Sequence, residues 1–141
     1  NHNTETVPRL YRVARPGGLY PRALELLSRA RAHAPGIATK SGIMVGLGEE
    51  WHEVIATLAD LHAAGVGIVT IGQYLSPSAS HLPVARYYHP DEFEMLRVTA
   101  ANMGFGHVEC GPLVRSSYHA HEQTSAYEEA GRTSYDDTCD S

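Results

Sequence analysis

The sequence contains few cysteines, and their spacing does not suit a metal cluster. Its 141 residues include only two, Cys110 and Cys139, and neither belongs to a CxxC or CxxxCxxC pattern. Because iron–sulfur clusters are held by closely spaced cysteine thiolates, this chain cannot assemble one from its own thiols in any familiar way. Two isolated cysteines are more typical of free thiols in the cytoplasm, although a disulfide between them stays open. We therefore expect a cytoplasmic protein, with an organelle as the alternative if the source is eukaryotic.

Long apolar runs and an excess of positive charge are also lacking. No stretch approaches the roughly 20 apolar residues that a membrane-spanning helix needs, and the formal net charge is −5. A negative chain is poorly suited to neutralise phosphates, so we expect neither a membrane nor a nucleic acid as partner. The first residues form no signal-peptide pattern and include no initiator methionine, which leads us to expect that the natural polypeptide begins further upstream.

Helical and extended patterns alternate along the rest of the chain. Three segments repeat apolar residues every three or four positions, which is typical of helices with one buried face, and three short apolar runs between them are typical of buried strands. Such alternation predicts an α/β fold with a parallel sheet, either as a small domain or as half of a larger barrel. The expected helices are 20–34, 49–64 and 90–103, and the expected strands are 37–45, 67–71 and 105–109.

Functional residues of parallel α/β folds lie where strands end, which directs attention to four segments. In the sequence these are 1–5, 40–49, 72–81 and 111–121. The glycines of 42–48 fit either a tight turn or the close approach of a flat ligand, and no phosphate-loop GK[ST] follows them. The segment after Gly72 fits either an adenine-binding edge or an ordinary polar loop.

Two other kinds of site are disfavoured by the spacing of serine and histidine. Ser117 and His119 are close in the sequence, but no G-x-S-x-G pattern surrounds the serine. The sequence therefore disfavours a serine hydrolase. No histidine pair has HExxH spacing, and catalytic zinc usually needs three protein ligands. We therefore expect most histidines to be surface groups.

A set of motifs in fixed order resembles the lipoyl synthase family of radical S-adenosylmethionine (radical-SAM) enzymes. GxxxGxxE is shared by many radical-SAM proteins, whereas RSSYHA together with GQYL and the NHN opening is specific. The resemblance covers residues 1 to about 123, and its motifs are NHNTETVPRLY, TKSGIMVGLGE, TIGQYLSPS, HLPVARYYHPDEF and GPLVRSSYHA.

The resemblance implies a division of the chain into three parts. Residues 1–114 would be the C-terminal half of a radical-SAM partial (β/α)6 TIM-like barrel, and 115–123 a cluster-ligand segment in a C-terminal extension. Residues 124–141, which lack a hydrophobic stripe, would be a polar, disordered tail.

The resemblance also implies an activity. Lipoyl synthases insert two sulfur atoms at carbons 6 and 8 of an octanoyl-lysine group on a lipoyl-carrier domain, which makes the octanoylated carrier the expected protein partner. They use S-adenosylmethionine and two 4Fe–4S clusters, whose cysteine motifs lie in the family's N-terminal half. Neither motif is present in this sequence. We therefore expect the chain alone to be inactive and to need that missing half.

Individual roles follow from the same resemblance. Ser117 matches the serine ligand of the auxiliary cluster, and Arg115 would orient this segment or neutralise charge, with a plain salt bridge as the alternative. Asn3 and Glu5 would bind the ribose or methionyl end of S-adenosylmethionine. Its carboxylate would meet Lys40 and Ser41, and its adenine would lie against Gly42, Gly46, Gln73, Tyr74 and Leu75.

One alternative from another functional class stays open at this point. The chain would then be a free-standing α/β module that binds a nucleotide or a partner without catalysis. A half barrel would expose strand edges and an apolar inner face, which favours a part of a larger enzyme over a self-sufficient module. Thr4 departs from the family pattern, because an apolar residue is expected at this position.

Overall fold

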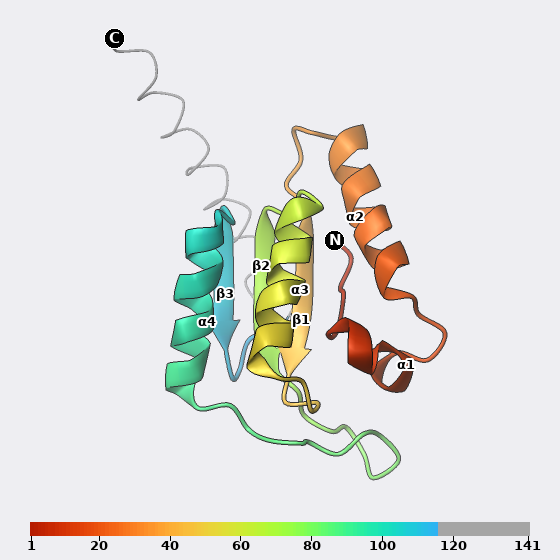
Figure 1. Ribbon diagram of the computed structural model, residues 1–141, viewed down its shortest axis with the longest axis vertical. Helices are drawn as coiled ribbons and strands as arrows, with labels where there is room; N and C mark the ends of the chain where they lie inside the picture. Colours follow the sequence, from red (N-terminus) through yellow and green to blue (C-terminus); the bar gives the residue numbers. More distant parts are fainter. Residues whose placement is uncertain (116–141) are drawn as a thin grey trace.

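The computed structural model describes residues 1–115, which form a parallel sheet with helices packed against it (Figure 1). The proposed ligand Ser117, most of the segment 115–123 and the expected tail 124–141 lie outside the described residues. The elements in chain order are a short 3-10 helix η1 (Pro8–Leu10), α1 (Tyr11–Ala14), α2 (Tyr20–His33), β1 (Lys40–Val45), α3 (Trp51–Ala63), β2 (Ile68–Gln73), α4 (Pro90–Met103) and β3 (His107–Gly111).

The predicted alternation of helices and strands is confirmed, and the boundaries differ for local reasons. The first strand begins at Lys40 rather than at Ile37, because the Ile37 amide donates to the Ala34 carbonyl in a turn and the Ile37 side chain is 69% exposed. The second helix begins after residue 49, since Glu50 is its N-cap and forms a capping box with Glu53. The sequence pattern did not predict η1 and α1.

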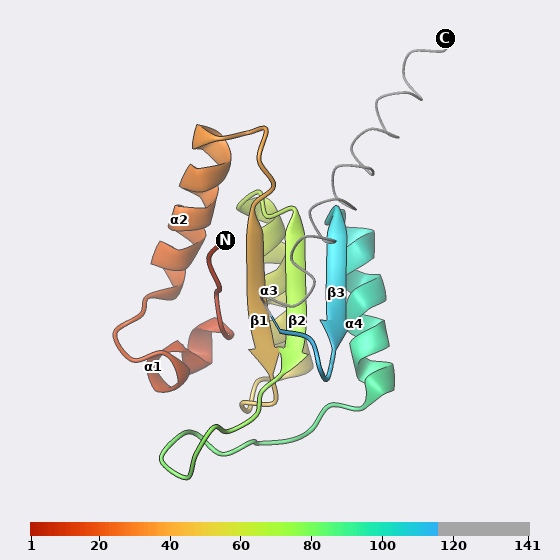
Figure 2. The same ribbon diagram turned by 180° about the vertical axis from the view of Figure 1, so that it is seen from behind.

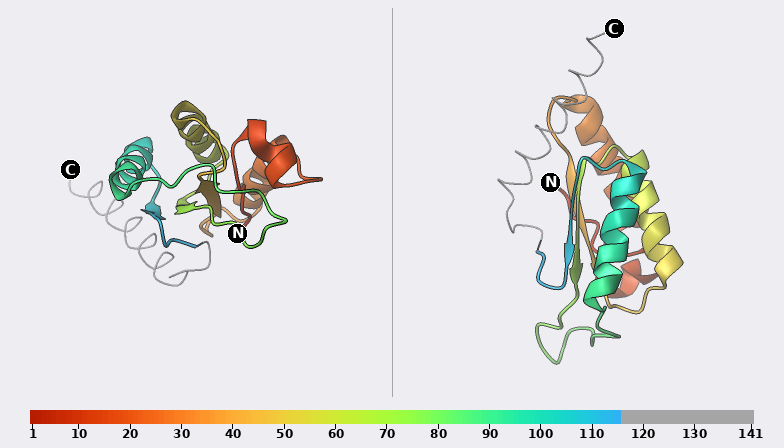
Figure 3. Two further views of the ribbon diagram at one scale, coloured as in Figure 1. Left: turned by 90° about the horizontal axis from the view of Figure 1, so that it is seen from below. Right: turned by 90° about the vertical axis from the view of Figure 1, so that its left-hand side faces the viewer.

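The three strands are parallel and follow one another in the sheet in chain order, β1-β2-β3. The N-terminal segment extends the sheet beyond β1, because Thr4 donates its amide to Gly42 and Glu5 accepts from the Met44 amide at 2.8 Å. Figure 3 shows α3 and α4 on the same face of this sheet, and Figure 2 shows the opposite face in front. The described residues therefore form successive strand–helix units wound in one direction.

Side-chain alternation along the strands separates the two faces of the sheet. Ile43 and Val45 of β1 and Val69 and Ile71 of β2 are buried in the core that the helices cover. Residues of the opposite parity, including Gly42, point to the other face, which we call the inner face. None of the helices within residues 1–115 is long and apolar enough to cross a membrane.

Candidate functional site

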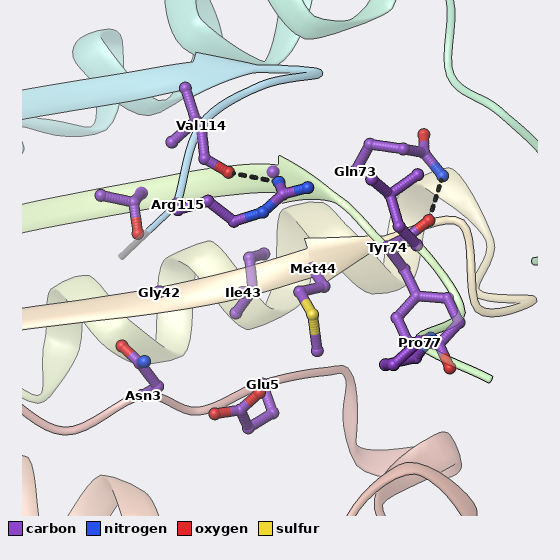
Figure 4. A pocket seen from close by; sticks show the side chains of 13 residues that line it. Asn3, Glu5, Gly42, Ile43, Met44, Gln73, Tyr74, Pro77, Val114 and Arg115 are labelled. Atoms are coloured by element: carbon purple, nitrogen blue, oxygen red, sulfur yellow. Dashed lines mark hydrogen bonds between the residues drawn. The ribbon is translucent and has the colours of Figure 1, made fainter. Parts of the chain in front are cut away.

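A pocket of about 280 Å³ opens on the inner face, where the strands reach their carboxyl ends (Figure 4). Four segments far apart in the sequence line it. They are the N-terminal segment with Asn3 and Glu5, the end of β1, the end of β2 with residues 73–77, and the chain after β3 with Val114 and Arg115. The carboxyl ends of parallel strands are the usual place for ligands in α/β proteins.

Glu5 is the one non-glycine residue among those described that has a positive φ, 75°. This left-handed conformation costs an L-residue roughly 1–2 kcal/mol. It is held by pairing on both sides of the residue, since Glu5 donates its amide to Gly42 and its carbonyl accepts from Met44. Figure 4 shows its carboxylate directed into the pocket. Backbone strain of this kind clusters at functional sites.

Asn3 contributes a buried side-chain oxygen to the same wall of the pocket. Its Oδ1 atom has no hydrogen-bond partner within residues 1–115, and an unsatisfied buried acceptor costs about 1–3 kcal/mol. Gly42 keeps the space beside it open, because a Cβ atom at this position would lie 3.2 Å from Asn3 Oδ1 and 2.5 Å from Thr70 Oγ1. The arrangement suits a ligand that supplies a hydrogen-bond donor.

Arg115 lies on the opposite side of the pocket from Glu5 (Figure 4). Its Nη1 atom donates to the Val114 carbonyl at 2.8 Å, and no ion pair joins Arg115 to Glu5 in the part of the chain that the structure describes. Met44 adds apolar surface between the two charges, and Pro77 adds more to one side of them (Figure 4). A pocket with opposite charges on two walls and apolar surface between them complements a zwitterionic ligand with an apolar or aromatic part.

Gln73 and Tyr74 line the pocket, but their polar side-chain atoms are already bonded within the protein. The Gln73 amide donates to the carbonyls of Tyr74 and Arg86, and its oxygen accepts from the Tyr88 amide at 2.9 Å. The Tyr74 hydroxyl donates to the Leu82 carbonyl at 2.7 Å. Together with the half-exposed Leu75, these residues offer a ligand surface for contact rather than side-chain hydrogen bonds.

Gly46 does not line the pocket, and the structure gives a different reason for its glycine. Its φ is 101°, and a Cβ atom would lie 2.3 Å from Gln73 Nε2 and 2.6 Å from the Arg86 carbonyl oxygen. The buried Glu49 carboxylate accepts from the amides of Gly46 and Leu47 and from the Tyr88 hydroxyl. Gly46 and Glu49 therefore hold the loop after β1 against the segment that precedes α4.

Lys40 and Ser41 are buried at the amino end of β1 and are not among the residues that line the pocket. The Ser41 hydroxyl lies 3.0 Å from the Thr4 hydroxyl, and both side chains are fully buried. This pairing explains how Thr4 is accommodated where an apolar residue is expected. Burial lowers the pKa of Lys40, and the charge of Glu109 partly offsets this effect.

Metal-ligating side chains do not gather anywhere within residues 1–115, because no three of His, Cys, Asp and Glu lie close enough to hold an ion. Cys110 packs against the core on the helix-covered side of the sheet, and burial raises the pKa of its thiol to about 12. Thiolate is the form that binds iron, so Cys110 is poorly suited to be a ligand.

Several lining residues were absent from the sequence-based set, namely Ile43, Met44, Thr70, Gly72, Pro77 and Val114. Two of them carried a usable signal. Strand alternation places Met44 on the same face as Gly42, and parallel pairing brings Thr70 opposite Gly42. Val114 carried no comparable signal, because its position depends on how the chain turns after β3.

The fold and the site define an α/β protein with a pocket of mixed polar and apolar lining at the carboxyl ends of parallel strands. No family model matches the chain. It is 60% identical over 124 residues to the lipoyl synthase of Rubrobacter xylanophilus, 58% identical over 125 residues to that of Idiomarina loihiensis, and 57% identical over 126 residues to that of Koribacter versatilis.

These matches cover 88–89% of this chain and 39–41% of the relatives. The chain belongs to the lipoyl synthase family, and it spans about two fifths of the length of the curated relatives it matches.

An ion pair fixes the long loop that borders the site. Arg86 donates from both terminal nitrogens to the Glu92 carboxylate, at 2.9 and 2.8 Å, and its guanidinium lies 3.7 Å from the centre of the Tyr88 ring. The Arg86 guanidinium holds the pKa of Glu92 down to about 2, with a smaller contribution from the His89 amide. The loop of residues 74–89 is thereby tied to the first turn of α4.

We predict that Glu92→Gln makes stability less dependent on pH in acid. The folded pKa of about 2 lies below the ordinary value of 4.5, so the stabilisation is present above pH 4.5 and is lost as the pH falls towards 2. Urea denaturation across this range should show a flatter profile for Glu92→Gln than for the unaltered chain. Glu25→Gln, which lies on the surface of α2 away from the loop, is the matched control. Parallel profiles for the unaltered chain and Glu92→Gln would contradict the prediction.

Proposed function

We propose that this chain is the C-terminal part of a lipoyl synthase that inserts two sulfur atoms at carbons 6 and 8 of a protein-bound octanoyl-lysine group. The observation that carries this proposal is the identity of 53–60% to lipoyl synthases over about nine tenths of the chain. The pocket at the strand ends agrees with it. No observation favours the alternative of a free-standing module without catalysis.

The proposed architecture is one half of a partial (β/α)6 barrel. Strands in chain order and two helices on one sheet face support it, because a singly wound sheet can close into a barrel whereas a doubly wound sheet has helices on both faces. The pocket volume of about 280 Å³ is slightly below the roughly 300–1,000 Å³ of small-molecule sites. This agrees with a site whose remaining walls come from the missing N-terminal half.

The residues of the pocket fit S-adenosylmethionine. Its methionyl end is a zwitterion, which Glu5 and Arg115 would bind through the ammonium and the carboxylate, and its ribose and adenine would donate hydrogen bonds to acceptors such as Asn3 Oδ1. Gly42 would leave room for the ligand against the strand, and Tyr74 and Leu75 would give contact surface. Bound at a reduced cluster, S-adenosylmethionine supplies the one-electron chemistry that removes hydrogen atoms from unactivated carbons.

Residues 1–115 could not hold either cluster by themselves. We propose that Ser117 provides the serine ligand of the auxiliary cluster and that the cysteine ligands of both clusters come from the missing N-terminal half. Arg115, two residues before Ser117, would orient this segment or neutralise charge. The protein would act in the cytoplasm on an octanoylated lipoyl-carrier domain.

The coding DNA upstream of Asn1 tests the proposal directly. We expect the reading frame to continue into a CxxxCxxC motif and a second motif with three cysteines, because the two clusters need these thiolates. A start codon and ribosome-binding site directly before Asn1 would contradict the proposal and support the non-catalytic module.

We predict that Glu5→Gln weakens the binding of S-adenosylmethionine in a full-length lipoyl synthase that carries this sequence. Hydrogen bonds to charged groups contribute about 1.5–3 kcal/mol, so the Kd should rise roughly ten- to a hundredfold. Equilibrium binding measures this change, and the melting temperature should stay the same because glutamine keeps the backbone pairing of residue 5. Glu25→Gln is again the control. An unchanged Kd would remove Glu5 from the proposed site.

We predict that Ser117→Cys retains the auxiliary cluster but blocks turnover. Oxygen is a harder ligand than thiolate and suits iron less well in a sulfur cluster. We infer that the weaker serine ligand allows an iron ion to leave when the cluster gives up sulfur. Iron content and lipoyl product, measured on the same reconstituted full-length protein, check this prediction. Normal product formation by the cysteine variant would refute it.

A further inference from the structure

The chain reverses direction directly after β3. The Val114 amide donates to the Gly111 carbonyl at 3.2 Å, which closes a four-residue turn. Figure 4 shows that the residues after this turn pass over the end of β2 on the inner face. Val114 and Arg115 thereby become part of the pocket wall, although β3 itself lies at the far edge of the sheet from the N-terminal segment.

Gly72 is the point of β2 over which this returning segment passes. A Cβ atom at Gly72 would lie 2.4 Å from the Val114 carbonyl oxygen and 3.6 Å from Arg115 Nη1. A separation of 2.4 Å from a backbone atom cannot be relieved by rotating a side chain. The Val114 oxygen is also the acceptor for the Arg115 guanidinium, so any displacement of this carbonyl also moves the guanidinium.

Backbone conformation does not require glycine at this position. Gly72 is not among the glycines with a positive φ, in contrast to Gly46 and Gly48. It belongs to a regular strand and pairs with Met44 on one side and with Gly111 on the other. The need for glycine therefore comes only from the space that the Val114 carbonyl occupies.

We propose that Gly72 is a positioning residue: the lack of a side chain at this point of β2 makes room for the Val114 carbonyl and so fixes Arg115 in the pocket. The placement of Val114 and Arg115 stands on the geometry alone. The consequence for the binding of S-adenosylmethionine rests on the proposed function. A methyl group at residue 72 would lift the segment off the sheet while leaving the helix-covered core intact, because residue 72 faces away from that core.

The test uses Gly72→Ala in a full-length lipoyl synthase that carries this sequence, with both clusters reconstituted. We expect hydrogen exchange of the Val114 amide to become at least tenfold faster and the Kd for S-adenosylmethionine to rise by a similar factor. The electron paramagnetic resonance signals of both clusters, recorded without S-adenosylmethionine, should stay unchanged. General destabilisation would alter these signals as well.

Two alanine variants serve as matched controls. A Cβ atom at Gly36 would meet nothing within 4 Å, and one at Gly111 would make only an ordinary contact of 3.5 Å with a Val114 side-chain carbon. Both should behave like the unaltered enzyme in every measurement.

Each other outcome has a definite meaning. Unchanged Val114 exchange in Gly72→Ala would overturn the proposal, even if the Kd rose, because Gly72 would then contact the ligand without seating the segment. Loss of folding would overturn it as well, since only a surface segment should be displaced. If the unaltered enzyme bound no S-adenosylmethionine while Gly72→Ala still accelerated exchange, the positioning role would stand and the proposed function would fall.

Discussion

The constraint on which the structure depends is the opposite character of the two faces of β1 and β2. Ile43, Val45, Val69 and Ile71, which share one parity, are aliphatic and buried under the helices. Gly42 and Gly72, of the other parity, have no side chain. The helix-covered face supplies the hydrophobic stabilisation of the sheet. The inner face leaves room for the pocket and for the returning segment after β3. A pocket at this place follows from the same alternation that builds the core.

Polar contacts hold the irregular loop that borders the pocket. The loop between β2 and α4 has no helix or strand of its own, yet Gln73 and Glu49 bond to its backbone and to Tyr88 with buried side chains. Burying a polar group costs free energy unless the group is hydrogen-bonded. Because the buried side chains of Gln73 and Glu49 are hydrogen-bonded, they resist rearrangement. This loop is therefore held in place beside the pocket, although its composition alone predicts an irregular segment.

The sequence predicted the α/β class and the order of the three longer helices and the three strands, because hydrophobic periodicity is a local property. It predicted the location of the pocket through the rule on strand ends. It did not distinguish the residues whose side chains enter the pocket from those that support it, and Ser41 and Gly46 belong to the second group. That distinction depends on strand register and on loop packing, which connect residues far apart in the sequence. The motif-based roles of Ser117 and of the cofactor contacts remain proposals.

The order of the strands also bears on how the protein forms during synthesis. Each strand pairs with the next one along the chain, starting from the N-terminal segment and ending with β3. A ribosome releases the N-terminal elements first, and each newly released strand finds its neighbour already in place. Among the strands of residues 1–115, none has to be inserted between two others that have already paired. Growth at the C-terminal edge therefore lets the sheet assemble in the direction of translation.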